Sequence, residues 1–336
     1  MSKRPNRITR KDVAQAAGVS TAVVSYVINN GPRPVAEPTR QRVLKAIDQL
    51  GYRVNALARS VKLGITSTVG IIAPDIEEPF HSWVVQELDQ RFRREGISIL
   101  LSNVHRDPIE EWKVANELIS RGVDFLVVLM SSLSDEQWVD AKFPIPVAMM
   151  DRPRALLGAL TVGPDFTDGG RKCTEHLISH GRMQIVPVFG EFNTSNENDR
   201  HAGYVQALKT AGLQPLTPII CEWKMQGGYQ AGLEYLRRGG TDFADGIFCF
   251  SDSIAIGLLR ALRENNVRIP KDVAVIGFDG ISLDAYTSPA LSTAAQPIQE
   301  MVDYIVQTLL DESLSLDALE LRKFPVQLKP AASCGC

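Results

Sequence analysis

The sequence lacks any apolar run near the roughly 18–20 residues of a membrane-spanning helix. Residues 1–11 are polar and no apolar stretch follows them, so we expect no secretory signal peptide. Cysteine is also scarce. The five cysteines are scattered and odd in number, which disfavours a disulfide framework; they are Cys173, Cys221, Cys249, Cys334 and Cys336. We therefore expect a reduced, cytoplasmic protein with no membrane partner.

The common catalytic motifs are missing as well. There is no Gly-x-Ser-x-Gly elbow, no phosphate-binding Gly-x-x-x-x-Gly-Lys-Ser/Thr loop, no His-Glu-x-x-His and no Rossmann glycine fingerprint. His176 and His180 could share a helix face, but no third ligand is apparent. Cys334 and Cys336 alone make a poor zinc site, and a frayed tail is the favoured interpretation. We expect a non-enzyme with no catalytic residue, metal site or cofactor.

Charge is present in near balance, with a net of −3, but it is unevenly distributed along the chain. Residues 1–64 hold 12 Lys and Arg against 3 Asp and Glu, a net of +9. The remainder holds 24 against 36, a net of −12. A basic front segment followed by an acidic body is typical of a protein that binds a polyanion at one end.

The front segment predicts short helices with defined ends. Thr9 and Asp12 have the spacing of a capping box that opens a helix over residues 10–17. Gly18-Val19 predicts a tight turn, and Ser20 is placed to cap a second helix. Two short helices joined by a tight glycine turn are typical of a helix-turn-helix unit.

A third helix supports the first two. Asn30-Gly31-Pro32 ends the second helix after Asn29, and Thr39 is expected to cap the third, which Gly51 ends. The apolar positions expected to face inward are Val23, Val24, Val27, Ile28, Val43, Ile47 and Leu50.

In such a unit, residues near the start of the second helix face base edges in the major groove. Here those residues are Thr21, Ala22 and Tyr26. Small polar side chains suited to phosphate contacts surround them: Thr9, Ser20, Ser25 and Asn29. A three-helix bundle without a DNA role is the alternative interpretation, and the basic charge disfavours it.

Beyond residue 65 the sequence alternates apolar strands with amphipathic helices. The predicted strands are 69–73, 97–101, 125–130, 147–150, 185–189, 246–250 and 273–278. The predicted helices are 82–95, 109–121, 169–180, 200–211, 254–265 and 299–312. Such alternation predicts α/β architecture with two doubly wound, parallel-sheet lobes.

Several motifs now carry a family resemblance. Ile-Thr-Arg-Lys-Asp-Val-Ala-Gln-Ala-Ala-Gly-Val-Ser at 8–20 and Asn-Ala-Leu-Ala-Arg-Ser-Val-Lys at 55–62 resemble the headpiece and hinge of the lac repressor (LacI/GalR) family. Ile72–Phe80, Met150–Pro153, Asp199–Tyr204, Phe250–Asp252 and Val275–Asp279 resemble stretches that recur in the same order in that family. The resemblance thus covers nearly the whole chain.

The resemblance implies a domain organisation and a hinge. It implies a headpiece over 1–52, a hinge over 53–64, and an effector-binding and dimerisation domain over 65–336. That domain resembles periplasmic sugar-binding proteins, with lobes over about 65–163 plus 295–322 and about 164–294 plus 323–336. In the family, paired hinge helices enter the minor groove with an apolar wedge. The matching residues here are Asn55, Ala58, Val61 and Lys62, with Val61 at the wedge position.

The resemblance also implies an effector cleft between the two lobes. Its candidate residues follow predicted strands or match family cleft positions; they are Asp75, Phe80, Arg200, Trp223, Asp252, Asp279 and Gln296. Each has a simpler interpretation, since the aspartates could cap helices, the aromatics could be core residues and Arg200 could form a surface ion pair. Phe166 stands where relatives often carry a polar residue. Asp151-Arg152-Pro153 is interpreted as a strand end near the lobe boundary.

The sequence therefore predicts a transcriptional regulator that represses from a palindromic DNA operator as a homodimer, because one headpiece reads few base pairs. Its control is expected to come from a sugar or related metabolite. Effector binding is expected to act through the dimer interface near residues 66–120. The alternative is control by a protein corepressor, with a vestigial cleft; an enzyme is the least favoured class.

Overall fold

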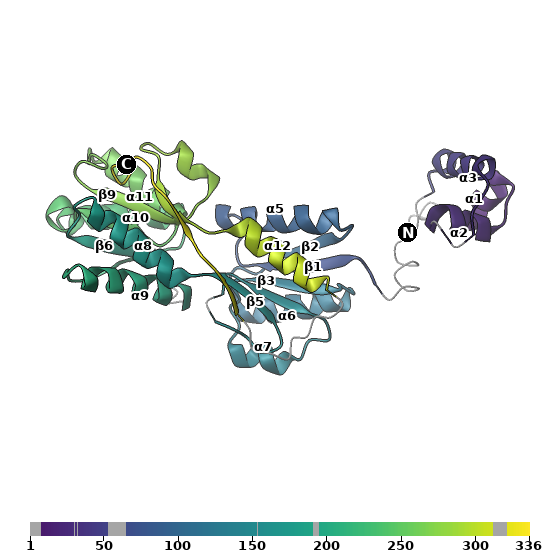
Figure 1. The fold of residues 1–336 in the computed structure, drawn as a ribbon, viewed down its shortest axis with the longest axis horizontal. Coiled ribbons are helices and arrows are strands. Elements are labelled where there is room, and N and C mark those ends of the chain that lie inside the picture. Colours follow the sequence, from purple (N-terminus) through teal and green to yellow (C-terminus); the bar gives the residue numbers. More distant parts are fainter. Residues whose placement is uncertain are drawn as a thin grey trace, which may run out of the picture. The chain divides into compact units, whose positions relative to one another are not determined.

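The computed structural model describes residues 8–29, 31, 33–52, 65–152, 154–190, 195–311 and 321–336. The chain divides into two compact units, Met1–Thr66 and Ser67–Cys336, and each has its own apolar core (Figure 1).

The first unit holds three helices: α1 (Arg10–Ala17), α2 (Thr21–Asn29) and α3 (Glu37–Leu50). The predicted capping box is confirmed, because Thr9 and Asp12 each accept a backbone N–H from the other end of the first turn. Gly18 ends α1 in the left-handed conformation, with φ 64°, and Gly51 ends α3 in the same way, with φ 62°.

The start of α3 differs from the prediction. The helix begins at Glu37, and its N-cap Ala36 lies three residues before the expected Thr39 cap. Proline is favoured in the first turn because its missing N–H is not needed there, and Pro38 occupies that place. The core of the unit is formed chiefly by Val13, Val24, Val27 and Val43. The remaining buried members of this core are alanines, and Ile28, Ile47 and Leu50 pack partly buried against it.

The second unit contains two six-stranded sheets. The first has the order β11-β5-β4-β3-β1-β2, and all its neighbouring strands run parallel. Its strands are β1 (Thr68–Ala73), β2 (Ser98–Asn103), β3 (Phe125–Leu129), β4 (Val147–Met150), β5 (Leu160–Pro164) and β11 (Leu321–Phe324). The helices beside it are α5 (Pro79–Arg94), α6 (Pro108–Ser120), α7 (Asp135–Ala141) and α12 (Ile298–Leu309).

The second sheet has the order β12-β10-β9-β8-β6-β7, and only β12 pairs in an antiparallel direction. Its strands are β6 (Ile185–Gly190), β7 (Ile219–Cys221), β8 (Gly246–Cys249), β9 (Ala274–Asp279), β10 (Ser292–Ala295) and β12 (Gln327–Lys329). The helices beside it are α8 (Phe166–Ser179), α9 (Ser195–Thr210), α10 (Met225–Arg237) and α11 (Asp252–Glu264), with short 3-10 turns at Gly240–Asp242 and Ser282–Tyr286.

Helices cover both faces of each sheet, so each lobe is a three-layer sandwich. In the first lobe one core contains Leu88 and Val302 and the other contains Ala115 and Trp138. In the second lobe the two cores contain Leu258 and Tyr204 respectively. The predicted doubly wound α/β architecture is confirmed, and the chain passes between the sheets at 164–166, 295–298 and 324–327 (Figure 1).

The C-terminal tail was expected to be frayed, and this expectation is wrong. Ser333 donates its backbone N–H to the Ala290 carbonyl at 2.9 Å and its hydroxyl to the Val275 carbonyl at 2.6 Å. Cys334 is 1% exposed. The tail is held because its polar groups complete hydrogen bonds beside β9 and β10 that the sheet leaves open.

The described residues include no helix with the length and apolar character that a membrane crossing requires.

Candidate functional site

One face of α2 presents the side chains expected to contact DNA bases. Thr21 and Ala22 are exposed, and Tyr26 is half-buried one turn after Ala22. The opposite face is buried, because Val24 and Val27 pack against α1 and α3. The sequence folds this way because apolar residues three apart on a short helix select a single inward face. The outward face of α2 is therefore available to a groove.

The residues expected to contact phosphate are placed at helix starts. The Ser20 hydroxyl accepts the Val23 backbone N–H at 3.3 Å, and Thr9 caps α1, so each lies where a helix directs free N–H groups outward. Ser25 is half-buried on α2. The Asn29 side chain and the hinge residues Asn55, Ala58, Val61 and Lys62 lie outside the described residues, and their contacts stay predictions.

Between the two lobes of the second unit lies a small cavity, called here the inner cavity. It is lined by Glu78, Phe80, His81, Met130, Asp151, Arg200, Trp223 and Asp279. Its volume is about 10 Å³, close to the space that one water molecule needs. A larger ligand can enter only if the two lobes separate.

Arg200 is the central side chain of the inner cavity. It extends from α9 and is 2% exposed, so it is not the surface ion pair weighed from sequence. The rings of Phe166 and Phe278 lie 4.6 and 4.3 Å from its guanidinium carbon, an arrangement in which a cation is attracted to both ring faces. Phe166, which stands where relatives often carry a polar residue, therefore helps to orient the Arg200 guanidinium.

Arg200 reaches this place because two helices approach closely. A Cβ added to Gly170 of α8 would lie 2.1 Å from the Arg200 carbonyl oxygen, and one added to Gly203 of α9 would lie 2.0 Å from the Thr167 carbonyl oxygen. Only glycine permits this separation of α8 and α9. The two glycines therefore set the position of Arg200.

The ends of three strands line the inner cavity in an uncommon backbone conformation. Met130 after β3, Asp151 after β4 and Asp279 at the end of β9 have φ of 45°, 59° and 121°. Positive φ at non-glycine residues is strained and clusters at functional sites. All three lie at carboxyl ends of strands, where open α/β sheets bind ligands.

Asp151 was interpreted from sequence only as a strand end, and it proves to be a cavity residue. It is 4% exposed, and Asn196 of α9 donates to its backbone carbonyl at 2.8 Å and to its Oδ2 at 3.3 Å. The strand-end position that identified Asp279 could also have identified Asp151.

Gln296 and Asp252 play different parts around Asp279. Gln296, on one of the crossings between lobes, donates its amide to Asp279 Oδ1 at 2.9 Å. Asp252 is fully buried and accepts from the backbone N–H groups of Gly280 and Ile281 and from the Thr293 hydroxyl. Asp252 therefore holds the turn after Asp279, and it does not line the inner cavity.

Four buried polar atoms around the inner cavity have no hydrogen-bond partner among the described residues. They are Asp151 Oδ1, Arg200 Nε and Nη1, and Gln296 Oε1. Leaving such atoms unpaired costs about 1–3 kcal/mol each, more when charged. Asp151 and Arg200 line the inner cavity and Gln296 bonds its lining residue Asp279, so unpaired donors and acceptors gather around one small space.

A second, outer cavity of about 160 Å³ adjoins the first and shares Glu78, His81 and Trp223 with it. Its remaining lining residues are Pro74, Asp75, His105, Arg106, Glu222 and Lys224. Contacts between lobes close it: Lys224 lies 3.3 Å from Asp75, and the Ser253 hydroxyl donates to Glu78 at 2.6 Å. The predicted Asp75 and Trp223 belong to this outer space.

Burial shifts the titration of the cavity groups. It raises the pKa of Asp151 to about 6, with Arg200 opposing the shift. It raises the pKa of Asp279 well above the usual range, again against Arg200. It lowers the pKa of His81 to about 4, and the His81 ring bonds the Asp75 carbonyl oxygen at 2.7 Å. The inner cavity thus disfavours net charge.

Comparison with known proteins agrees with both parts of the chain. Residues 9–55 match the family described as "Bacterial regulatory proteins, lacI family", and residues 174–330 match the "Periplasmic binding protein-like domain". The "HTH-type transcriptional repressor PurR" of Vibrio campbellii is 32% identical over 309 residues, which cover 90% of this chain and 91% of that protein. The chain belongs to the lacI family.

Solved structures of lacI-family proteins show the same fold. The lac repressor dimer bound to operator and the anti-inducer ONPF has a TM-score of 0.86 at 24% identity, covering 98% of this chain and 99% of that one. A lacI-family regulator from Enterococcus faecium with bound ribose has a TM-score of 0.70 at 29% identity, covering 79% and 98%. This lacI-family chain is accordingly a DNA-binding transcriptional regulator.

Proposed function

We propose that this lacI-family regulator represses transcription from a palindromic operator as a homodimer, under the control of a small polar effector bound between its lobes. The single observation that carries the effector assignment is the set of four unpaired buried polar atoms at the inner cavity. A vestigial cleft would have no reason to keep them, because each one destabilises the ligand-free fold. A protein corepressor explains none of them.

The chemistry of the cavity limits the effector. Arg200 offers a rigid fork of donors, whereas Asp151 and Gln296 offer acceptors. Asp151, Asp279 and Glu78 line the space, and burial raises the pKa of all three, so the surroundings disfavour the added negative charge of an anionic ligand. Phe80 and Trp223 supply the apolar surface that covers a ring. A neutral compound rich in hydroxyl or amide groups, such as a sugar or a nucleobase, fits this set.

Relatives of this chain include named repressors and regulators solved with a bound sugar. Names of curated relatives include a transcriptional repressor PurR from Haemophilus influenzae, 33% identical over 310 residues. A structure of the regulator CelR in complex with cellobiose has a TM-score of 0.68 at 26% identity. The ribose-bound Enterococcus faecium regulator belongs to the same group. Because this lacI-family chain has a polar cavity between its lobes, we propose that it binds a ligand similar in size to these sugars.

The test begins with the operator. Duplexes selected by the full-length chain from a random pool would identify the DNA site, and polarisation of a labelled duplex would measure its affinity. A thermal-shift panel of sugars, sugar phosphates, nucleosides and purines would identify ligands whose stabilisation grows with concentration. Any such ligand is expected to change operator affinity about 5–150-fold, because coupling between sites is typically 1–3 kcal/mol.

Arg200→Lys is the decisive variant, with Arg260→Lys on the exposed face of α11 as its matched control. Lysine keeps the charge and loses the fork, so ligand affinity should fall at least about tenfold while operator affinity without ligand is unchanged. Equal ligand affinity in Arg200→Lys would exclude the inner cavity as the effector site. A monomer in sedimentation of the operator complex would exclude the homodimer.

A further inference from the structure

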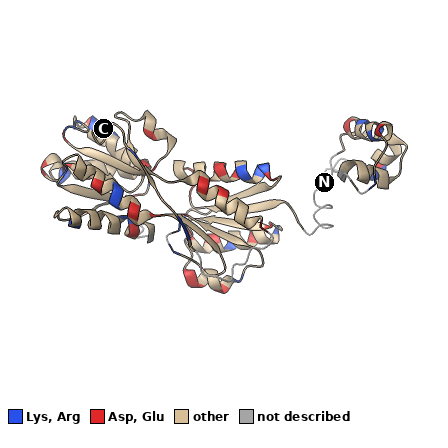
Figure 2. Ribbon diagram, viewed as in Figure 1, with Lys and Arg blue, Asp and Glu red and all other residues tan. Residues whose placement is uncertain are grey.

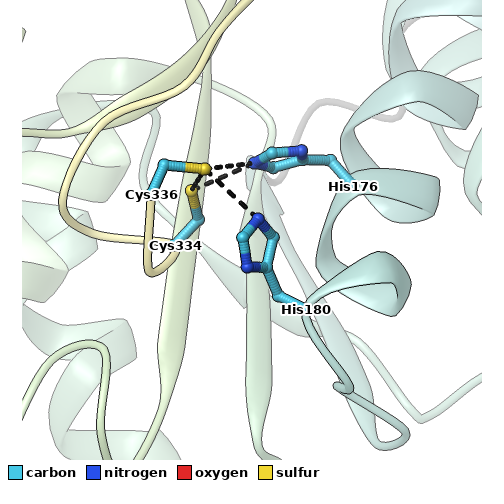
Figure 3. A group of neighbouring side chains, drawn as sticks. All are labelled: His176, His180, Cys334 and Cys336. Carbon is cyan, nitrogen blue, oxygen red and sulfur yellow. Dashed lines mark hydrogen bonds between the residues drawn. The ribbon is translucent and has the colours of Figure 1, made fainter.

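Two pairs of metal-binding side chains that lie far apart in the sequence meet at the end of α8. His176 and His180 occupy the last turn and C-cap of α8, and Cys334 and Cys336 lie on the C-terminal tail, about 160 residues later. Their donor atoms all lie within 4.8 Å of one another. Figure 3 shows the two imidazole rings and the two sulfur atoms directed at a common point.

The separations between donor atoms are close to those of a tetrahedral centre. The two sulfur atoms are 3.4 Å apart, and His176 Nε2 lies 3.0 and 3.5 Å from them. His180 Nε2 lies 3.2 Å from Cys336 Sγ. Bonds of about 2.3 Å to sulfur and about 2.0 Å to nitrogen separate the donors of a tetrahedral zinc ion by roughly 3.3–3.8 Å. A small inward or outward adjustment of the side chains would complete the coordination.

The local backbone brings the donors together without further rearrangement. His176 and His180 are four residues apart, so one helix face presents both rings, which lie 4.7 Å apart in an edge-on arrangement. Gly335, with φ 106°, turns the chain so that the two flanking thiols face the same side. Gly335 is therefore the residue that makes a Cys-x-Cys pair chelating here.

The surroundings supply what a metal–thiolate centre needs beyond its ligands. The Ser292 hydroxyl lies 2.9 Å from Cys334 Sγ and can donate a hydrogen bond to the thiolate. The Ser333 hydrogen bonds to Ala290 and Val275 fix the tail on which both cysteines lie. Cys334 is buried whereas Cys336 is exposed, which leaves a route for the ion from solvent. All five cysteines are free thiols, and 3.4 Å is far beyond a disulfide bond of about 2.05 Å.

We infer that His176, His180, Cys334 and Cys336 form a structural zinc site that fastens the C-terminal tail to α8. Two thiolates balance the charge of Zn²⁺, and four protein donors leave no open position, which is the composition of structural rather than catalytic zinc centres. The ion would hold the C-terminal end of the helix whose N-terminal residue, Phe166, contacts Arg200.

The test uses the reduced, chelator-treated full-length chain and cobalt as a spectroscopic probe. One equivalent of Co²⁺ is expected to give a thiolate-to-cobalt charge-transfer band and the intense visible bands of tetrahedral cobalt, and Zn²⁺ should bleach both. Zinc should also raise Tm, and Mg²⁺ should do neither, because hard cations avoid thiolates. Competition with a chromophoric chelator would give the zinc affinity.

Cys336→Ser and His180→Gln remove one donor each at the edge of the cluster. Both are expected to lower zinc affinity by at least about 100-fold. Loss of an outer-shell partner alone can cost up to about 100-fold, and loss of a direct ligand should cost at least as much. Cys221→Ser and His201→Gln are the matched controls and should bind zinc as the unmodified chain does, since neither residue belongs to the cluster. Absence of the tetrahedral cobalt spectrum, or zinc affinity unchanged in Cys336→Ser and His180→Gln, would overturn the assignment.

Discussion

Arg200 shows how burial and function conflict at a single residue. Its guanidinium lies between two phenylalanine rings and 3.7 Å from Asp279, yet two of its nitrogens lack partners among the described residues. The aromatic faces and the nearby carboxylate offset part of the cost of removing the charge from water. The rest of that cost is offset only when a ligand accepts from the free nitrogens.

Asp151 leads to a prediction about pH. Its pKa is raised to about 6 by burial, so the folded chain binds a proton that the unfolded chain releases near pH 4. The stabilisation from that proton is present at low pH and is lost as pH rises through about 6. Asp151→Asn should therefore be more stable relative to the unmodified chain at pH 8 than at pH 4.5, by on the order of 2 kcal/mol, because pH 4.5 already lies between the two pKa values.

Denaturant unfolding of both chains across this range would measure the difference. Asp151→Asn must be compared with the unmodified chain at each pH, because His81 changes the stability of both chains with pH in the opposite direction. Its pKa is lowered to about 4, so its contribution is present above about 6.5 and is lost on acidification. Asp140→Asn, on an exposed position of α7, is the control for an Asp→Asn change outside the cavity. A stability difference between Asp151→Asn and the unmodified chain that is constant with pH would contradict the assignment.

Some cavity residues could be predicted from sequence and others could not. Asp75, Phe80, Trp223 and Asp279 line the two cavities because carboxyl ends of strands converge in this architecture. Asp252 also follows the carboxyl end of a strand, but its side chain points into the lobe and accepts backbone N–H groups. The spacing of residues in the sequence does not indicate which way this side chain points. The sequence did not predict that the His176/His180 pair meets the Cys334/Cys336 pair, because no local pattern relates residues this far apart in the chain.

At the scale of elements, most strands of the two sheets could be predicted from their apolar runs, whereas several strands that are short or interrupted by Gly, Pro or Ser could not. Val147–Met150 was predicted with the bounds that β4 has. Leu160–Pro164 and Ser292–Ala295 were missed, because Gly, Pro, Ser and Ala have low strand propensity and only pairing with neighbours makes them strands. Helix α10 was missed because glycines interrupt its pattern.

Those glycines have a packing role that propensity ignores. A Cβ on Gly228 of α10 would lie 2.0 Å from the Ile254 carbonyl oxygen of α11, and one on Gly257 of α11 would lie 1.8 Å from the Met225 carbonyl oxygen. Glycine is unfavourable within an isolated helix by about 1 kcal/mol, but here it lets two helices approach closely. The pair α8 and α9 uses the same device next to the cavity.

Gly170→Ala tests this device where it bears on function. The added methyl group would force α9 away from α8 and carry Arg200 with it, since the contact is with the Arg200 backbone. Overpacking of this kind costs typically about 1–3 kcal/mol of unfolding free energy. The increase in Tm caused by any ligand found in the thermal-shift panel should fall in Gly170→Ala by a larger fraction than the unfolding free energy of the ligand-free chain.

Ser179→Ala, at an exposed position of the same helix, is the control and should change stability by less than about 0.5 kcal/mol. If Gly170→Ala matched this control in both unfolding free energy and ligand response, the close approach of α8 and α9 would have no part in placing Arg200.

At the scale of the whole molecule, charge and fold divide the chain at the same place. The basic segment ends near residue 64 and the first compact unit ends at Thr66. Figure 2 shows Asp and Glu on several helices of the second unit, including α7. A net of −12 over that part repels DNA, so it contributes no general affinity for the polyanion.

A chain that begins at residue 67 tests this division. It keeps both sheets and their cores, so it should fold and respond to the same ligands as the full chain, yet it should not bind the selected operator. The full chain should lose operator affinity steeply with salt, because each neutralised phosphate releases counterions. Polarisation at several salt concentrations, with ligand-induced thermal shifts to show that the fragment is folded, would measure both. Operator binding by the folded fragment at the affinity of the full chain would place DNA recognition in the acidic body and contradict the assignment to α2.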